Sequence, residues 1–222
     1  MRLSWWKILC IVQLLLLSVA GLIGGVPAKP ILNETIRNLY YHVAMWFAMS
    51  IFFVVSVVNA VMYLRTGKQK YDFYSVEYAN SGIVFGTLGL LTGMVWANYT
   101  WGAPWSNDPK QLGAAIAILI YVAYLVLRGS LPDLDKRARV GAVYNIFAFF
   151  MLIPTIWVIP RLLESLHPGG MGNPALNTKD IDSRMRLVFW LLAVPGWSLL
   201  GVWITTLRIR YKVLEEKKLQ HA

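Results

Sequence analysis

Residues 38–64, NLYYHVAMWFAMSIFFVVSVVNAVMYL, contain no charged side chain. A helix needs roughly 17 or more consecutive apolar residues to cross about 30 Å of hydrocarbon, so this run is long enough for one crossing. The chain as a whole is 57% hydrophobic and only 14% charged, which excludes an ordinary soluble domain. Five further charge-free runs lie on either side of this one, at residues 8–27, 78–107, 111–127, 140–160 and 187–207.

The six runs predict an all-α polytopic integral membrane protein that forms a single membrane domain over residues 1–222. The run at 78–107 is too long for one span, so we expect its ends to be loop. We expect the first run to remain as an uncleaved helix, because it exceeds the apolar core of a signal peptide. The six transmembrane helices are predicted near residues 8–27, 42–64, 79–98, 109–128, 140–160 and 187–208.

The basic residues are distributed unequally between the connections. With the amino terminus in the cytoplasm, fourteen of the 21 Lys and Arg residues fall in cytoplasmic segments and seven in external ones. This bias follows the positive-inside rule and predicts that both termini are cytoplasmic. Orientation in the lipid bilayer accounts for most of the net charge of +10, so the charge does not require a nucleic-acid partner. The external connections then include a Trp-rich loop at 96–109 and a long loop at 161–186.

The second external connection contains residues 101–113, WGAPWSNDPKQLG. Asp108 is followed by Pro109 and, three positions after the aspartate, by Gln111. An Asp cap, a proline at the first helical position and a glutamine at the third form a helix-start signature. The expected role of Asp108 is therefore to cap the fourth helix, and this role leaves a contact with a ligand open.

Trp96, Trp101 and Trp105 recur within ten positions of the same region. Tryptophans gather at membrane interfaces because the ring is apolar and its N–H seeks water, so an interfacial anchor is one interpretation. Gly102 and Pro104, however, bend the backbone between two of the indoles, which an anchor does not need. The alternative is an apolar platform for a large planar aromatic ligand.

Two of the three histidines fall on the external face with this loop. His42 lies at the outer end of the second predicted helix, and His167 lies in the long external loop. Neutral imidazole is the commonest metal ligand among side chains, and haem iron is held by one or two axial histidines. Each histidine taken singly is also compatible with an ordinary interfacial or solvent-exposed residue.

External basic residues are candidates to pair with the propionates of a haem. The alternative for each of them is pairing with lipid headgroups. The candidates are Lys110, Arg184, Arg186 and Arg37.

The stretch Trp101-Gly102-x-x-Trp105-x-x-Asp108-x-Lys110 resembles the tryptophan-rich signature of the WWD family of haem-handling membrane proteins. With six predicted helices, "YYHVAMWFAM" around His42 and "SLHPGGMGNP" around His167, the chain resembles CcmC-type haem transporters of cytochrome c maturation across its whole length. The sequence departs from the family pattern in Asn107, where a Trp is usual, and in Lys110, where an Arg is usual.

The resemblance implies a haem-binding protein of the bacterial inner membrane that exports or handles haem b as a transient cargo. It implies that His42 and His167 are axial ligands of the haem iron. The Trp-rich loop would be the platform that presents haem at the periplasmic face to a haem chaperone. The implied partners are the subunits of an ATP-binding cassette (ABC) transporter and a small single-helix subunit.

The residues themselves leave open whether the chain is an enzyme. They include no hydrolase motif and no Walker A sequence, so ATP hydrolysis is expected from partners. The resemblance implies a part in haem attachment to the chaperone within a complex. Two other functions are considered: a membrane cytochrome b-type electron carrier or quinone-reactive subunit, and a transporter for a non-haem substrate. The predicted helix centres offer only neutral polar residues such as Asn59 and Asn145, which does not favour the second.

Overall fold

The computed structural model describes residues 4–167 and 181–220, and this part of the chain is helical with no strand. Six of its helical segments are long and apolar enough to cross a membrane, which confirms the predicted number of spans. The elements are α1 (Trp5–Leu22), η1 (Asn33–Tyr40), α2 (His42–Thr66), α3 (Gln69–Trp101), α4 (Pro109–Ser130), α5 (Leu134–Leu152), η2 (Ile153–Val158), η3 (Ile159–Arg161), α6 (Ser183–Val188), η4 (Phe189–Ala193) and α7 (Val194–Gln220).

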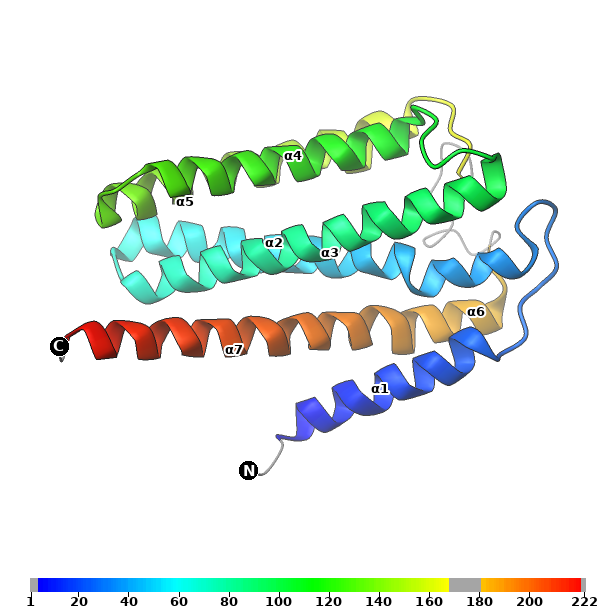
Figure 1. The fold of residues 1–222 in the computed structure, drawn as a ribbon, viewed down its shortest axis with the longest axis horizontal. Coiled ribbons are helices and arrows are strands. Elements are labelled where there is room, and N and C mark those ends of the chain that lie inside the picture. Colours follow the sequence, from blue (N-terminus) through cyan, green and yellow to red (C-terminus); the bar gives the residue numbers. More distant parts are fainter. Residues whose placement is uncertain (1–3, 168–180, 221–222) are drawn as a thin grey trace.

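The helices run roughly side by side, with α2 and α3 between the α4–α5 pair and the α1–α7 pair (Figure 1). The start of α1 and the end of α7 lie at one end of the bundle, together with the short turns after α2 and α4 (Figure 1). The opposite end carries η1, the connection between α3 and α4, η3 and α6. We call this second end the loop end. The described parts of the connections predicted to be external therefore meet at one end of the molecule.

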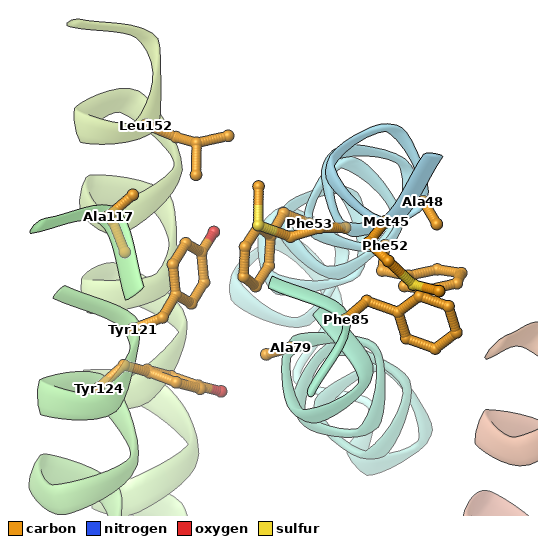
Figure 2. Packing of buried hydrophobic residues seen from close by; sticks show 12 residues of the cluster. Met45, Ala48, Phe52, Phe53, Ala79, Phe85, Ala117, Tyr121, Tyr124 and Leu152 are labelled. Atoms are coloured by element: carbon orange, nitrogen blue, oxygen red, sulfur yellow. The ribbon is translucent and has the colours of Figure 1, made fainter. Parts of the chain in front are cut away.

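Aromatic side chains fill the space between the central helix pair and α4 (Figure 2). The Phe53 ring of α2 stacks on the Tyr121 ring of α4, with centroids 3.6 Å apart and planes 9° apart. On the other side of the central pair, towards α7, Phe52 meets Phe85 of α3 edge to face at 5.0 Å (Figure 2). Gly82 lets the α3 backbone approach α2, because a Cβ atom there would lie 2.4 Å from the Phe53 ring. Such close packing is typical of helix interfaces in membranes.

The helix α3 extends beyond its charge-free run because its acidic residues are paired inside the bundle. On α3, Asp72 forms a bidentate ion pair with Arg128 of α4, with N–O distances of 2.8 and 2.9 Å. Glu77, also on α3, is fully buried and contacts Arg208 and Lys212 of α7. As a result α3 begins at Gln69 instead of near residue 79. The last helix, α7, continues to Gln220, and its residues 213–218 are exposed. Buried charges are tolerated when they are paired in this way.

Candidate functional site

A cavity of about 180 Å³ opens at the loop end of the bundle. Its walls come from the segment before η1, from η1, α2, α3, α4, η2 and η3, and from His167 and Ile181. Along α2 it reaches from His42 to Ser50, which is two helical turns. His167 lines the same cavity, and both histidines also line a smaller adjoining pocket with Trp96 and Trp101. The fold thus brings the two predicted ligands, 125 positions apart in the chain, to one site.

His42 is the first residue of α2 and is buried, with 7% of its surface exposed. Its Nδ1 atom lies 2.7 Å from the backbone carbonyl oxygen of Gly89 on α3. A carbonyl oxygen can only accept a hydrogen bond, so Nδ1 carries the proton and donates it. Nε2 is then left with the lone pair. Metal-binding histidines characteristically donate their second ring N–H to a carbonyl or carboxylate in this way.

The close approach of α3 to His42 depends on Gly93, which was not among the predicted site residues. A Cβ atom at position 93 would lie 2.5 Å from Cε1 of His42. One turn earlier, a Cβ atom at Gly89 would lie 2.9 Å from the Trp46 ring. The i,i+4 spacing of these glycines on a long apolar helix is the signal that could have identified them.

His167 is held by Asp108, whose side chain is almost fully buried. The Nδ1 atom of His167 lies 2.9 Å from Oδ1 of Asp108. The carboxylate also accepts the backbone N–H of Lys110 at 2.9 Å, which confirms the predicted N-cap of α4. It further accepts the backbone N–H of Leu166 at 2.7 Å and the hydroxyl of Ser165 at 2.9 Å. Ser165 was not predicted, because it contacts Asp108 only through the fold.

These contacts determine the charge of Asp108. Burial by itself would raise the pKa of Asp108, but the hydrogen bonds from His167, Lys110 and Leu166 hold the pKa well below its ordinary value. The carboxylate is therefore ionised at neutral pH and can only accept hydrogen bonds. Consequently Nδ1 of His167 donates to Asp108, and Nε2 is the ring nitrogen left for a ligand, as it is in His42.

The helix α3 continues to Trp101, beyond its predicted end near residue 98, so Trp96 and Trp101 lie on this helix and not in a loop. Of the three tryptophans, Trp105 lies in the connection to α4. Trp96 meets the His42 ring edge to face at 5.9 Å and donates its indole N–H to Thr35 at 2.9 Å. Trp101 meets the His167 ring at 4.9 Å. Trp105 is not among the lining residues of either cavity in the described structure, and its indole N–H bonds to Asn107 at 2.8 Å.

The backbone between α3 and α4 contains two positions with positive φ. Gly102 follows the end of α3 with a φ of 80°, in the left-handed region that a glycine adopts without strain. Asn107 has a φ of 56°, and asparagine is among the few other residues that tolerate this region. Asn107 therefore suits the backbone turn, and its side-chain oxygen accepts a hydrogen bond from the indole N–H of Trp105.

Three cationic residues line the main cavity: Lys29, Lys110 and Arg161. Of these, only Lys110 was among the predicted propionate partners. Arg161 is the last residue of η3, which directly follows the π-helical segment η2. The segment η2 itself contributes Ile156 and Trp157 to the cavity wall. Π-helical turns within α-helices are frequent at functional sites.

The other predicted cations lie elsewhere. Arg184 is exposed on α6, and neither it nor Arg186 lines the cavity. Arg37 pairs with Glu34 and donates to the backbone oxygens of Gly21 and Gly24. The Gly/Pro-rich residues 168–180, which were expected to be part of the external loop, lie outside the described residues.

The arrangement offers two imidazoles in an aromatic cavity. Among the described residues, no group of three or more His, Cys, Asp or Glu side chains could hold a metal ion. A zinc ion bound by protein alone usually has three or four such ligands. Two imidazoles that are each anchored through Nδ1 instead suit a metal whose remaining ligands come from a flat organic ring.

Comparison with known proteins identifies relatives of two kinds. The family model described as "CcmC: Heme exporter protein C" matches residues 1–222. Heme exporter protein C of Haemophilus influenzae is 26% identical over 91% of this chain and 82% of its own length. Cytochrome c biogenesis protein CcsA of Arabidopsis thaliana is 43% identical over 46% of this chain and 30% of its own length. CcsA of Prochlorococcus marinus is 35% identical over 47% of this chain and 32% of its own length.

The matches to CcsA proteins thus cover about a third of those longer relatives. The match to the family model, in contrast, runs along the whole of this chain. The chain belongs to the heme exporter protein C family.

Proposed function

We propose that the chain binds haem b as a transient cargo at the loop end and presents it to a haem chaperone for the biogenesis of c-type cytochromes. The observation that carries this proposal is that His42 and His167 line one cavity and that Nδ1 is engaged in each ring, which leaves Nε2 as the nitrogen for a ligand. The description of the family supports haem as the cargo. The name of the CcsA relatives supports a role in cytochrome c biogenesis.

The cavity suits each part of a haem. His42 and His167 would supply the axial ligands of the iron, and Trp46, Trp96 and neighbouring aliphatic side chains would contact the porphyrin. Lys110 and Arg161 line the same cavity and suit the two propionate carboxylates. In this proposal the chain binds and orients haem, and the bound haem supplies the iron.

The rest of the Trp-rich loop is assigned to the transfer step. Trp101 contacts His167, and Trp105 lies outside the cavity against Asn107. We assign to this part of the loop the surface that presents haem to the chaperone. The excess of basic residues at the end with both termini supports cytoplasmic termini and a periplasmic loop end in the bacterial inner membrane.

The energy for the process must come from partners. The 222 residues contain no G-x-x-x-x-G-K-[ST] sequence. We therefore assign ATP hydrolysis to the subunits of an ABC transporter, with a small single-helix membrane protein in the same complex. Attachment of haem to the chaperone would be an activity of that complex.

The test is the visible spectrum of the detergent-purified protein, oxidised and reduced, for wild type, His42→Ala and His167→Ala. We expect a haem spectrum that weakens or shifts in both variants. His221→Ala, which removes the third histidine of the chain, is the control and should match wild type. A protein that stays colourless with haem supplied and its partners co-expressed would overturn the proposal. Haem that cycles with quinol and never transfers to a chaperone would favour a cytochrome b-type carrier.

A further inference from the structure

Asp108 makes more contacts than a helix cap requires. Capping of α4 uses one hydrogen bond, from the backbone N–H of Lys110. The carboxylate has three further donors in a segment almost sixty residues away: Ser165, Leu166 and His167. Asp108 is only 3% exposed, so these bonds are protected from competing water. They connect the Trp-rich loop to the segment that carries the second histidine.

The contact with Asp108 aims the His167 ring. Because Nδ1 donates to the carboxylate, Nε2 is the atom left for a ligand, and it is on the opposite edge of the imidazole. Trp101 packs edge-on against the same ring at 4.9 Å and restricts its tilt. The backbone N–H of His167 donates a hydrogen bond to the Ser165 hydroxyl, with an N–O distance of 3.1 Å. This bond constrains the backbone between Ser165 and His167.

The two histidines differ in the acceptor behind them. Nδ1 of His42 faces the neutral backbone carbonyl of Gly89, whereas Nδ1 of His167 faces the anionic carboxylate of Asp108. A hydrogen bond to an anion is stronger than one to a neutral acceptor and makes the imidazole a better electron donor to a metal. A stronger donor stabilises ferric over ferrous iron.

We propose that Asp108 is a positioning residue that, with Ser165, orients His167 and strengthens its Nε2 atom as an iron ligand. This inference rests on the proposed haem site. Through His167, Asp108 would increase the affinity for haem and lower the reduction potential of the bound iron. His42, with its neutral acceptor, is the weaker donor of the pair.

The test compares Asp108→Asn with wild type in the detergent-purified chain titrated with hemin. Asparagine caps helices as well as aspartate does, so α4 should still form. We expect hemin affinity to fall about 10- to 100-fold, the range typical for loss of a partner behind a metal-binding histidine. We also expect a higher reduction potential in a spectroelectrochemical titration. Asp133→Asn is the matched control, because Asp133 caps α5 through Lys136 and is exposed.

A double-mutant cycle separates positioning from simple structural support. If Asp108 acts through His167, Asp108→Asn should leave the potential unchanged once His167 is alanine. A shift that persists in the His167→Ala background would overturn the inference. So would an Asp108→Asn protein with wild-type hemin affinity and potential. In both cases the haem site itself would stand, provided that wild type binds hemin and His167→Ala changes its spectrum.

Ser165→Ala is the second variant and leaves the cap of α4 intact. We expect a smaller change than for Asp108→Asn, in the same direction for both affinity and potential. If Asp108→Asn fails to accumulate, a Ser165→Ala protein that is indistinguishable from wild type would overturn the inference. A wild-type protein that binds no hemin would instead overturn the proposed function.

Discussion

Gly93 of α3 faces the imidazole of His42 so closely that a Cβ atom at position 93 would lie 2.5 Å from Cε1 of the histidine. Real Cβ contacts are longer than this, so an alanine must displace the ring. The displacement would break the hydrogen bond between Nδ1 and the carbonyl of Gly89. Gly93 is therefore part of the support for the more deeply buried of the two histidines.

Gly93→Ala is expected to weaken hemin binding about 10- to 100-fold, as for other losses of support behind a metal-binding histidine. Gly129→Ala is the control, since a Cβ atom at position 129 meets nothing within 4 Å. That variant should bind hemin as wild type does and be equally stable or slightly more stable, by up to about 1 kcal/mol. Equal affinities for the two alanine variants would contradict the role of Gly93. Hemin titration of the purified proteins measures both.

Trp96 and Trp105 should differ in their effects. Trp96 lines the cavity and contacts His42, so Trp96→Ala should weaken hemin binding about 2- to 10-fold, the value of one aromatic contact. Trp105 bonds to Asn107 away from the cavity, so Trp105→Ala should keep wild-type affinity and instead slow transfer to a chaperone. The measurements are hemin titration and the rate of haem transfer to purified chaperone. A larger loss of affinity in Trp105→Ala than in Trp96→Ala would refute this division.

Arg161 and Arg184 provide a similar pair among the cations. Arg161 lines the cavity, and a hydrogen bond between charged groups contributes about 1.5–3 kcal/mol, so Arg161→Gln should weaken hemin binding about 10- to 100-fold. Arg184 is exposed on α6 outside the cavity, and Arg184→Gln should change affinity little. An iron porphyrin without propionates should bind wild type and Arg161→Gln with similar affinity. If Arg161→Gln weakens the binding of both porphyrins equally, Arg161 does not act through charge pairing with the propionates.

The ion pair at the opposite end of the bundle should matter for stability and not for haem. Asp72→Ala would leave the largely buried Arg128 guanidinium without its carboxylate partner. Breaking a buried pair in this way costs about 3–5 kcal/mol, so the thermal unfolding midpoint in detergent should fall clearly. Asp135→Ala, at an exposed position in the first turn of α5, is the control. An unchanged midpoint for Asp72→Ala would show that the pair adds nothing to stability.

Local sequence was sufficient for the number and class of the helices. Crossing a bilayer demands a long run of uncharged residues, and this is a property of each segment by itself. The cap at Asp108 was predictable for the same reason, because its signature lies within four consecutive residues. The early start of α3 was not, since Asp72 and Glu77 are tolerated there only because cations of α4 and α7 reach them.

The composition of the site depended on contacts between distant segments. The sequence suggested His42 and His167 as ligands and placed them on one face of the membrane. Helix packing then supplied the acceptors behind them, Gly89 and Asp108, 47 and 59 positions away. Packing also placed Arg161 at the cavity and left Arg184 outside it. Hydrophobic length and caps are local quantities, whereas the rotation and approach of helices, which decide which side chains meet, arise only when all the segments pack together.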